Sequence, residues 1–98
     1  MTPIVMSNPS VLHNPEASRF EATVEGHLCL ADYGLHAGVM SIDHTYVPPA
    51  LEGRGIAAAL VAAALAHARA QGLRVRPVCS YVVAYMRQRR DTHDLLEA

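Results

Sequence analysis

The sequence contains no lysine, so all eight of its cationic side chains are arginines, and nine acidic residues balance them. The resulting net charge of −1 excludes a global attraction to nucleic acid or to an anionic membrane. Two cysteines, Cys29 and Cys79, are too few for a disulfide framework and indicate free thiols. No apolar run reaches the roughly 18 residues of a membrane span, and the N-terminus lacks the regions of a signal peptide. These absences predict a soluble, cytoplasmic protein that has neither nucleic acid nor a membrane as its partner.

The length and the hydrophobic content bound the architecture. A chain of 98 residues has room for one domain, and a hydrophobic fraction of 51% excludes a disordered chain. We therefore expect a single domain over 1–98. Residues 1–17 contain the turn formers Pro3, Asn8, Pro9 and Pro15, which predict a loosely structured arm. Within this arm we expect a short strand around 11–12. The polar residues 91–98 predict a frayed tail.

Alternating side chains predict three consecutive strands. Residues 19–26 alternate polar and apolar side chains, which is typical of a half-buried strand. A turn at Gly26 and His27 leads to a second strand over 28–33 that closes at Gly34, so the two form an antiparallel hairpin. A third strand follows over 38–47, and it ends at Pro48 and Pro49 because proline cannot continue a central strand.

The third strand carries a histidine on its apolar side. In a regular strand, every second side chain points to the same face. Met40, Ile42, His44 and Tyr46 therefore share one face, and we expect His44 to lie among apolar neighbours.

The rest of the chain predicts two helices and one more strand. Residues 55–71 form a long helix, since nine of the fifteen residues from 56 to 70 are alanine and Gly72 supplies a stop. Residues 73–78 resume alternation as a fourth strand, and Ser80 caps a second helix from Tyr81 to about Arg89. The predicted fold class is α/β (α+β), with a small antiparallel sheet packed by one long helix and a short C-terminal helix.

The loop before the long helix combines glycines with an uncapped helix start. No Ser, Thr, Asp or Asn accepts the amides of the first turn. Gly53 and Gly55 allow a ligand to approach the backbone closely, and Arg54 adds a positive charge. This arrangement predicts a phosphate or pyrophosphate site, with a glycine-rich turn capped by water as the alternative. A Walker loop is excluded because no Gly-Lys-Ser/Thr follows and the chain has no lysine. A dinucleotide fingerprint is excluded because the chain lacks the length of a parallel strand-helix-strand unit and a matching acidic residue.

Three short motifs carry a resemblance to a known family. They are His44-Thr45-Tyr46-Val47-Pro48, Gly53-Arg54-Gly55-Ile56-Ala57, and Pro77-Val78-Cys79-Ser80-Tyr81-Val82 with Tyr85. Together, from about residue 19 to residue 85, the chain resembles the YjdJ-type branch of the GNAT superfamily of acyl-CoA-dependent N-acetyltransferases.

The resemblance implies a GNAT-like fold and acetyl-CoA (coenzyme A) as the cosubstrate. It implies that the coenzyme A pyrophosphate binds at Gly53, Arg54, Gly55, Ile56 and Ala57. It further implies that the pantetheine arm lies along Tyr46 and Val47. The wider superfamily begins this loop with Gln or Arg, where this sequence has Glu52.

The same branch implies a catalytic cysteine and histidine, which match Cys79 and His44. An imidazole can lower the pKa of a thiol or accept its proton. Two routes stay open: His44 activates Cys79, which takes the acetyl group and passes it to an amine, or the amine attacks acetyl-CoA directly with His44 as the base. Tyr81 and Tyr85 share one helix face, where they pack in the core or protonate the departing thiolate.

We therefore expect an enzyme, an acetyl-CoA-binding N-acetyltransferase that moves an acetyl group to an amine. The contrasting hypothesis is a non-catalytic coenzyme A binding or protein-interaction module with the same fold. We predict no metal site, because the histidines form no i, i+4 pair and no Cys-x-x-Cys is present. The acceptor amine, a small molecule or a protein, is unknown. A chain this short lacks the additional C-terminal strands of ordinary GNAT enzymes, so its acceptor site should be shallow and open.

Overall fold

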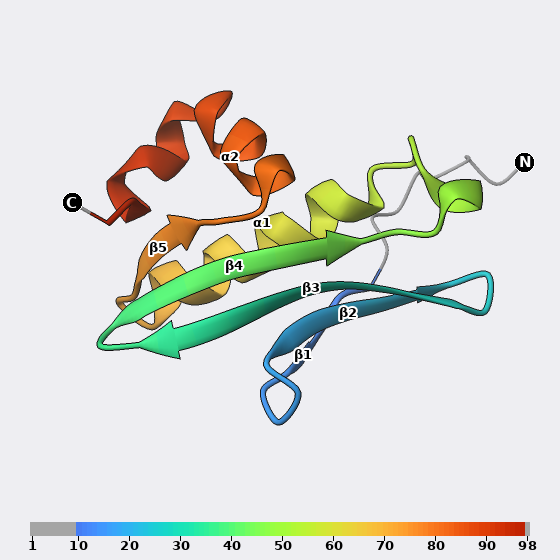
Figure 1. Cartoon of the computed structure of the whole chain (residues 1–98), viewed down its shortest axis with the longest axis horizontal. Helices are drawn as coiled ribbons and strands as arrows, with labels where there is room; N and C mark the ends of the chain where they lie inside the picture. The colour runs from blue at the N-terminus through green and yellow to red at the C-terminus, as the bar shows by residue number, and fades with distance from the viewer. Residues whose placement is uncertain (1–9, 98) are drawn as a thin grey trace, which may run out of the picture.

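The computed structural model describes residues 10–97. These residues contain a five-stranded sheet in the order β1-β2-β3-β4-β5. The strands are β1 (Leu12–Asn14), β2 (Arg19–Val24), β3 (His27–His36), β4 (Val39–Tyr46) and β5 (Arg74–Pro77). The helices are α1 (Ile56–Ala70) and α2 (Ser80–Arg87), with the short 3-10 helices η1 (Pro49–Leu51) and η2 (Arg90–Leu95). In Figure 1 the sheet lies in front of α1, while α2 stands beside β5.

The sheet is mixed, because β5 runs parallel to β4 while the other neighbouring strands are antiparallel. The 15 residues of α1 carry the chain back along the sheet at roughly 1.5 Å per residue, so β5 starts at the same end as β4. The predicted fold of a small sheet with one long helix and a short C-terminal helix is confirmed. The antiparallel pairing expected throughout this sheet is corrected at one edge, because β4, α1 and β5 form a parallel unit.

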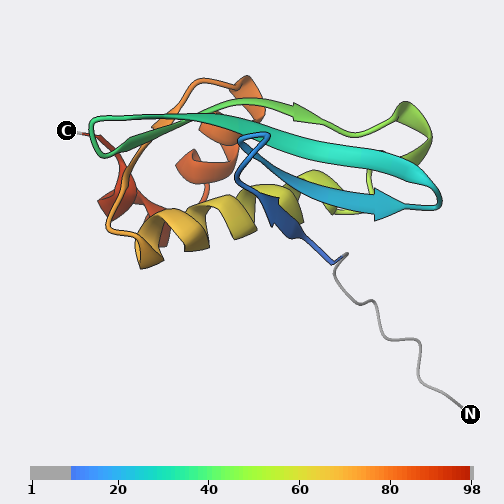
Figure 2. The ribbon, with the colours of Figure 1, turned by 90° about the horizontal axis from the view of Figure 1, so that it is seen from below.

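Helix α1 covers one face of the sheet, as Figure 2 shows from below. Its alanines make the whole helix apolar, but only one stripe is buried, at the spacing of a helix that packs on a sheet. The buried residues of this stripe are Ile56, Leu60, Val61, Ala64, Leu65 and Ala68. This packing fixes the N-terminus of α1 beside the end of β4.

The turns between β2 and β3 and between β3 and β4 place their two central residues at positive φ. Glu25 and Gly26 have φ values of 50° and 78°, and Ala37 and Gly38 have 50° and 80°. Two-residue turns of this kind match the twist of antiparallel strands. The predicted turn at Gly26 and His27 is therefore displaced by one residue, because His27 already belongs to β3.

Strand β3 does not close at Gly34 but continues to His36. A glycine inside a strand often marks a close approach of a neighbour. At this position a Cβ atom would lie 3.1 Å from the Ser41 Oγ of β4. Gly34 is thus a packing residue within β3 and not a stop signal.

A β-bulge in β4 reverses the side-chain pattern that the sequence predicts there. Asp32 pairs with His44 and Tyr33 with Ile42, so Asp43 has no partner on β3. Ile42, before the bulge, is fully buried. After the bulge His44 lies opposite Asp32, on the face away from α1, and its side chain is 78% exposed. The expected position of His44 among apolar neighbours is wrong, because one inserted residue shifts a period-2 pattern by one position.

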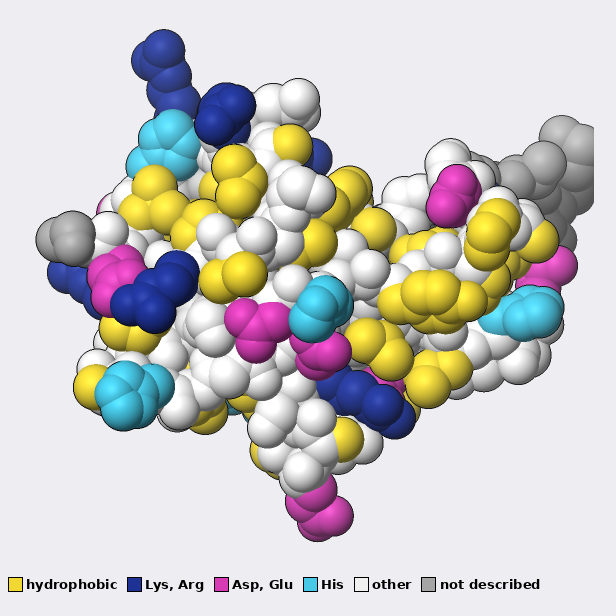
Figure 3. Space-filling model, in the orientation of Figure 1, with side chains coloured by type: hydrophobic (Ala, Val, Ile, Leu, Met, Phe, Trp, Pro, Cys, Tyr) yellow, Lys and Arg dark blue, Asp and Glu magenta, His cyan; other side chains and the backbone are white. Residues whose placement is uncertain are grey.

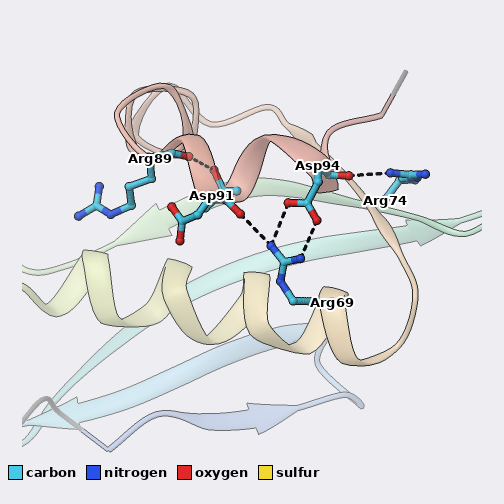
Figure 4. A network of polar contacts seen from close by, with 6 residues as sticks. Arg69, Arg74, Arg89, Asp91 and Asp94 are labelled. Carbon is cyan, nitrogen blue, oxygen red and sulfur yellow. Dashed lines mark hydrogen bonds and ion pairs between the residues drawn. The ribbon is translucent and has the colours of Figure 1, made fainter.

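The C-terminal segment is packed against the body, and the expected frayed tail is wrong for residues 91–97. Arg69 of α1 donates two hydrogen bonds to the Asp94 carboxylate, at 2.6 and 3.0 Å, and one to the Asp91 carbonyl (Figure 4). Arg74 donates to the Asp94 carbonyl at 2.6 Å. Leu95 is buried in the core, so η2 completes the end of the molecule.

The expected N-terminal arm is described only from residue 10 onward, and its residues 1–9 lie outside the described range. Residues 12–14 form the edge strand β1, close to the strand expected around 11–12. His13 of β1 stacks on Phe20 at a centroid distance of 4.4 Å and approaches His67 of α1 at 4.3 Å. Within residues 10–97, no helix combines the length and the apolar character that a membrane crossing requires.

Candidate functional site

A cavity of about 610 Å³ lies between the end of β4, the start of α1 and α2. Figure 3 shows the surface hollowed between the α2 lobe and the loop that follows β4. The volume and the largely apolar walls are typical of a site for a small molecule or cofactor. The lining residues are Thr45, Tyr46, Val47, Pro49, Leu51, Glu52, Gly53, Gly55, Ile56, Ala57, Ala58 and Tyr81.

The N-terminus of α1 offers uncapped backbone donors to this cavity. Gly55 is the N-cap residue with a φ of 79°, and no side chain caps the helix. The first backbone bond of this turn runs from the Ala59 N–H to the Gly55 carbonyl, at 3.0 Å. The amides of the preceding helical residues Ile56, Ala57 and Ala58 come before that bond and line the cavity. Gly53 also has positive φ, so the loop that delivers these amides depends on glycine. The arrangement suits an anionic group such as a phosphate.

The charged residues of this loop point in different directions. Arg54 forms an ion pair with Glu25 in the turn between β2 and β3. The Arg54 guanidinium lowers the pKa of the Glu25 carboxyl by hydrogen bonding and by its charge. Arg54 is not among the residues that line the cavity, whereas Glu52 is. Of the seven residues predicted to bind the cosubstrate, the structure therefore brings six together at the cavity and turns Arg54 toward Glu25.

The strands β4 and β5 separate beside the cavity. Their pairing ends where Ile42 meets Pro77. The amides of Val78 and Cys79 both donate to the Ile42 carbonyl at 3.1 Å, after which the chain turns into α2. Strand β4 continues to Tyr46, paired with β3 alone. Its backbone edge on the β5 side is therefore available to an extended ligand that carries amide groups.

Cys79 lies at the junction of β5 and α2, next to Thr45. Its Sγ is 3.6 Å from the Thr45 Oγ1. Burial raises the pKa of the Cys79 thiol, but the Thr45 hydroxyl and the backbone amides of Val82, Tyr81 and Thr45 lower it, and the net pKa is below the ordinary value. Cys79 is also the N-cap residue of α2, in the position that the sequence predicted for Ser80. This cysteine has the environment of a reactive thiol.

His44 is bonded to a different partner. Its Nδ1 is 3.2 Å from the Asp32 Oδ1 across β3 and β4. Thr45, the next residue, pairs with buried Ala31 and so faces the α1 side. His44 and Cys79 consequently belong to two separate polar contacts, and no hydrogen bond between them is found in the part of the chain that the structure describes.

Two partners in the site were not singled out from the sequence. Thr45 stands inside the motif His44–Pro48, but only the bulge turns it toward Cys79. Asp32 carries no sequence signal, because its contact with His44 depends on the register between β3 and β4. Tyr81 lines the cavity, whereas the Tyr85 ring lies under the Arg89 guanidinium at 3.8 Å.

The fold and this site define an α+β protein in which the N-terminus of α1 and the separated strands β4 and β5 meet at one cavity. Comparison with known families then assigns the chain to a family. Residues 19–95 match the model of the GCN5-related N-acetyl-transferase family, and the chain belongs to this family. The fold is similar to the NMR solution structure of a GCN5-like candidate N-acetyltransferase from Staphylococcus aureus. That similarity has a TM-score of 0.73 at 23% identity and covers 94% of this chain and 91% of the other. None of the curated proteins matches the sequence.

Proposed function

We propose that the protein is an acetyl-CoA-dependent N-acetyltransferase of the short YjdJ-type branch, which transfers an acetyl group to an amine. The observation that carries this proposal is the meeting of two backbone features at one cavity, in a member of the GCN5-related family. The uncapped amides of Ile56, Ala57 and Ala58 suit a pyrophosphate. The free edge of β4 at Tyr46 and Val47 suits the amide groups of pantetheine.

The chemistry can follow either of two routes. In the relay, the Cys79 sulfur attacks the thioester carbon, a new C–S bond forms, and the bond to coenzyme A breaks. The coenzyme A thiolate then takes up a proton. The amine next attacks the acetyl group on Cys79, so that a C–N bond forms, the C–S bond to Cys79 breaks and the amine releases a proton. In direct transfer, the amine attacks the thioester carbon, a C–N bond forms and the C–S bond to coenzyme A breaks. The amine proton passes to His44, and the departing coenzyme A thiolate takes up a proton.

The separate contacts of the two residues favour separate roles. His44 pairs with Asp32, and a carboxylate beside an imidazole orients the ring. An imidazole held in this way can serve as a base for an amine that arrives on the open face, the side of β4 opposite to Thr45. Cys79 takes its polar contacts from Thr45 and α2, so its reactivity does not depend on a bond to His44.

Calorimetric titration with acetyl-CoA and coenzyme A tests the binding half of the proposal. Ala57→Glu places a carboxylate in the first turn of α1, where it should repel a pyrophosphate and weaken binding at least about tenfold. The same carboxylate suits the helix dipole, so the melting temperature should not fall. Ala57→Gln is the matched control without the charge. Absence of binding of either ligand to the unmodified protein contradicts the proposal.

Chromatographic measurement of coenzyme A release with a panel of amines tests turnover. We expect release with the unmodified protein and its loss in His44→Ala. An acetyl adduct on Cys79, detected by mass spectrometry, supports the relay, whereas full activity in Cys79→Ser eliminates it. Binding without release for any amine would instead favour a non-catalytic coenzyme A binding module.

A further inference from the structure

We infer that Thr45 is a positioning residue that orients the Cys79 sulfur beside the cavity and favours its thiolate form, a role that the resemblance had led us to expect of His44. The catalytic meaning of this inference rests on the relay route of the proposed function. The contact itself does not, because it is a property of the folded chain without a ligand.

The β-bulge is the feature that brings Thr45 to Cys79. Asp43 is the extra residue of β4, so Thr45 pairs with Ala31 and faces the same side as that buried residue. In a strand without the bulge, the Thr45 side chain would point to the face opposite that of Ile42, which is the open face. With the bulge, the Thr45 Oγ1 lies 3.6 Å from the Cys79 Sγ and Thr45 also lines the cavity.

The backbone around Cys79 supports the same role. Cys79 is tied to β4 by its own N–H bond to the Ile42 carbonyl, at 3.1 Å. Cys79 is also the N-cap residue of α2, whose first amides stabilise negative charge. A hydroxyl and several amides are all donors, which favour a thiolate over a thiol.

Charged side chains do not account for the state of this thiol. His44 on β4 is paired with Asp32 on the opposite face, and Asp43 lies over Gly34 on that face. On α2, Tyr81 is the titratable neighbour in the cavity wall, and burial raises its pKa, so it stays neutral near pH 7. Arg76 of β5 is paired with Glu97. The polar groups that lower the pKa of Cys79 are the Thr45 hydroxyl and the amides of Val82, Tyr81 and Thr45.

In the relay, this contact raises the fraction of Cys79 that can attack. The thiolate forms a C–S bond with the acetyl carbon, the C–S bond to coenzyme A breaks, and the departing thiolate takes a proton from solvent. Thr45 neither gains nor loses a proton in this exchange, because its hydroxyl only forms a hydrogen bond with the sulfur. Removing its hydroxyl should slow acylation at a pH below the thiol pKa and leave it unchanged well above.

The test is the pH profile of Cys79 alkylation by iodoacetamide, followed by mass spectrometry of the Cys79 peptide without any coenzyme A present. Thr45→Val keeps the shape of the side chain and removes the hydroxyl, so the midpoint should move upward by about one pH unit. Thr45→Ser keeps the hydroxyl and should restore the midpoint. His44→Ala should leave it where it is. Melting temperatures establish that each variant is folded, and Thr45→Ala replaces Thr45→Val if the latter is not.

Each outcome separates this inference from the proposed function. An unchanged midpoint in the folded variant without the hydroxyl, or an upward move in His44→Ala, overturns the role of Thr45, whatever coenzyme A does. A midpoint that moves in Thr45→Val, in a protein that does not bind acetyl-CoA, supports the role of Thr45 and contradicts the acetyltransferase. If both hold, acetylation of Cys79 by acetyl-CoA should be about tenfold slower in Thr45→Val below the midpoint.

Discussion

At the scale of single residues, the polar side chains near the cavity fall into two groups on opposite faces of β4. His44 and Asp32 form one group on the open face, and Thr45 and Cys79 form the other on the α1 side. The neighbouring residues His44 and Thr45 thus have different partners, since consecutive side chains of a strand point to opposite faces. The two groups are therefore separate polar environments, one on each face of the strand.

His13 gives a residue-scale prediction about stability and pH. Burial lowers its pKa, and so does the nearby His67, while its Nε2 is 2.6 Å from the Tyr33 hydroxyl. Because the folded pKa lies below the unfolded value of 6.5, stability is fully present above pH 6.5 and declines as the pH falls toward the folded pKa. His13→Phe keeps the stack on Phe20 and removes this titration.

Chemical denaturation between pH 7.5 and pH 5 measures the effect of that variant. We expect a lower stability of His13→Phe at neutral pH, because the Tyr33 hydroxyl loses its partner, but a flatter dependence on pH. Equal slopes for the two proteins would show that His13 contributes nothing to the acid sensitivity.

At the scale of elements, the turns that close the hairpins carry avoidable strain. Ala37 has a φ of 50° and is followed by Gly38 at 80°, which is the arrangement in which Asn-Gly is preferred. The left-handed region costs a non-glycine residue roughly 1–2 kcal/mol, and asparagine tolerates it better than alanine. Ala37 is exposed, so no packing is lost on substitution.

We therefore expect Ala37→Asn to raise the free energy of unfolding by about 0.5–1 kcal/mol. Ala37→Val, which is β-branched, should lower it. Urea denaturation monitors both changes, and the binding of acetyl-CoA should be the same in the two variants since the turn lies away from the cavity. A loss of stability in Ala37→Asn would contradict the turn geometry.

At the scale of the whole molecule, helices cover one face of the sheet and leave the other open in the described part of the chain (Figures 1 and 2). His44 lies on that open face, with 78% of its side chain exposed. An amine that approaches His44 meets no wall formed by an additional helix or strand of residues 10–97. Specificity for the shape of the acceptor should accordingly be low.

A panel of amines of increasing size tests this consequence once turnover is established. We expect rates within about one order of magnitude across primary amines, because few side chains can discriminate among them. Preference for one amine by about a thousandfold would show instead that a defined acceptor pocket exists. The control is His44→Ala, which should lower all rates together if His44 is the shared base.

The sequence by itself determined the local features of this protein. Alanine content and Gly72 define α1, alternation defines β2, and the two glycines before α1 leave its amides uncapped, because each depends on neighbours along the chain. Strand order and register depend on contacts between distant segments. The parallel β5, the bulge at Asp43 and the pairing of Thr45 with Cys79 were therefore decided only by the tertiary structure, since one residue inserted between two paired strands exchanges their faces without any local trace in the sequence.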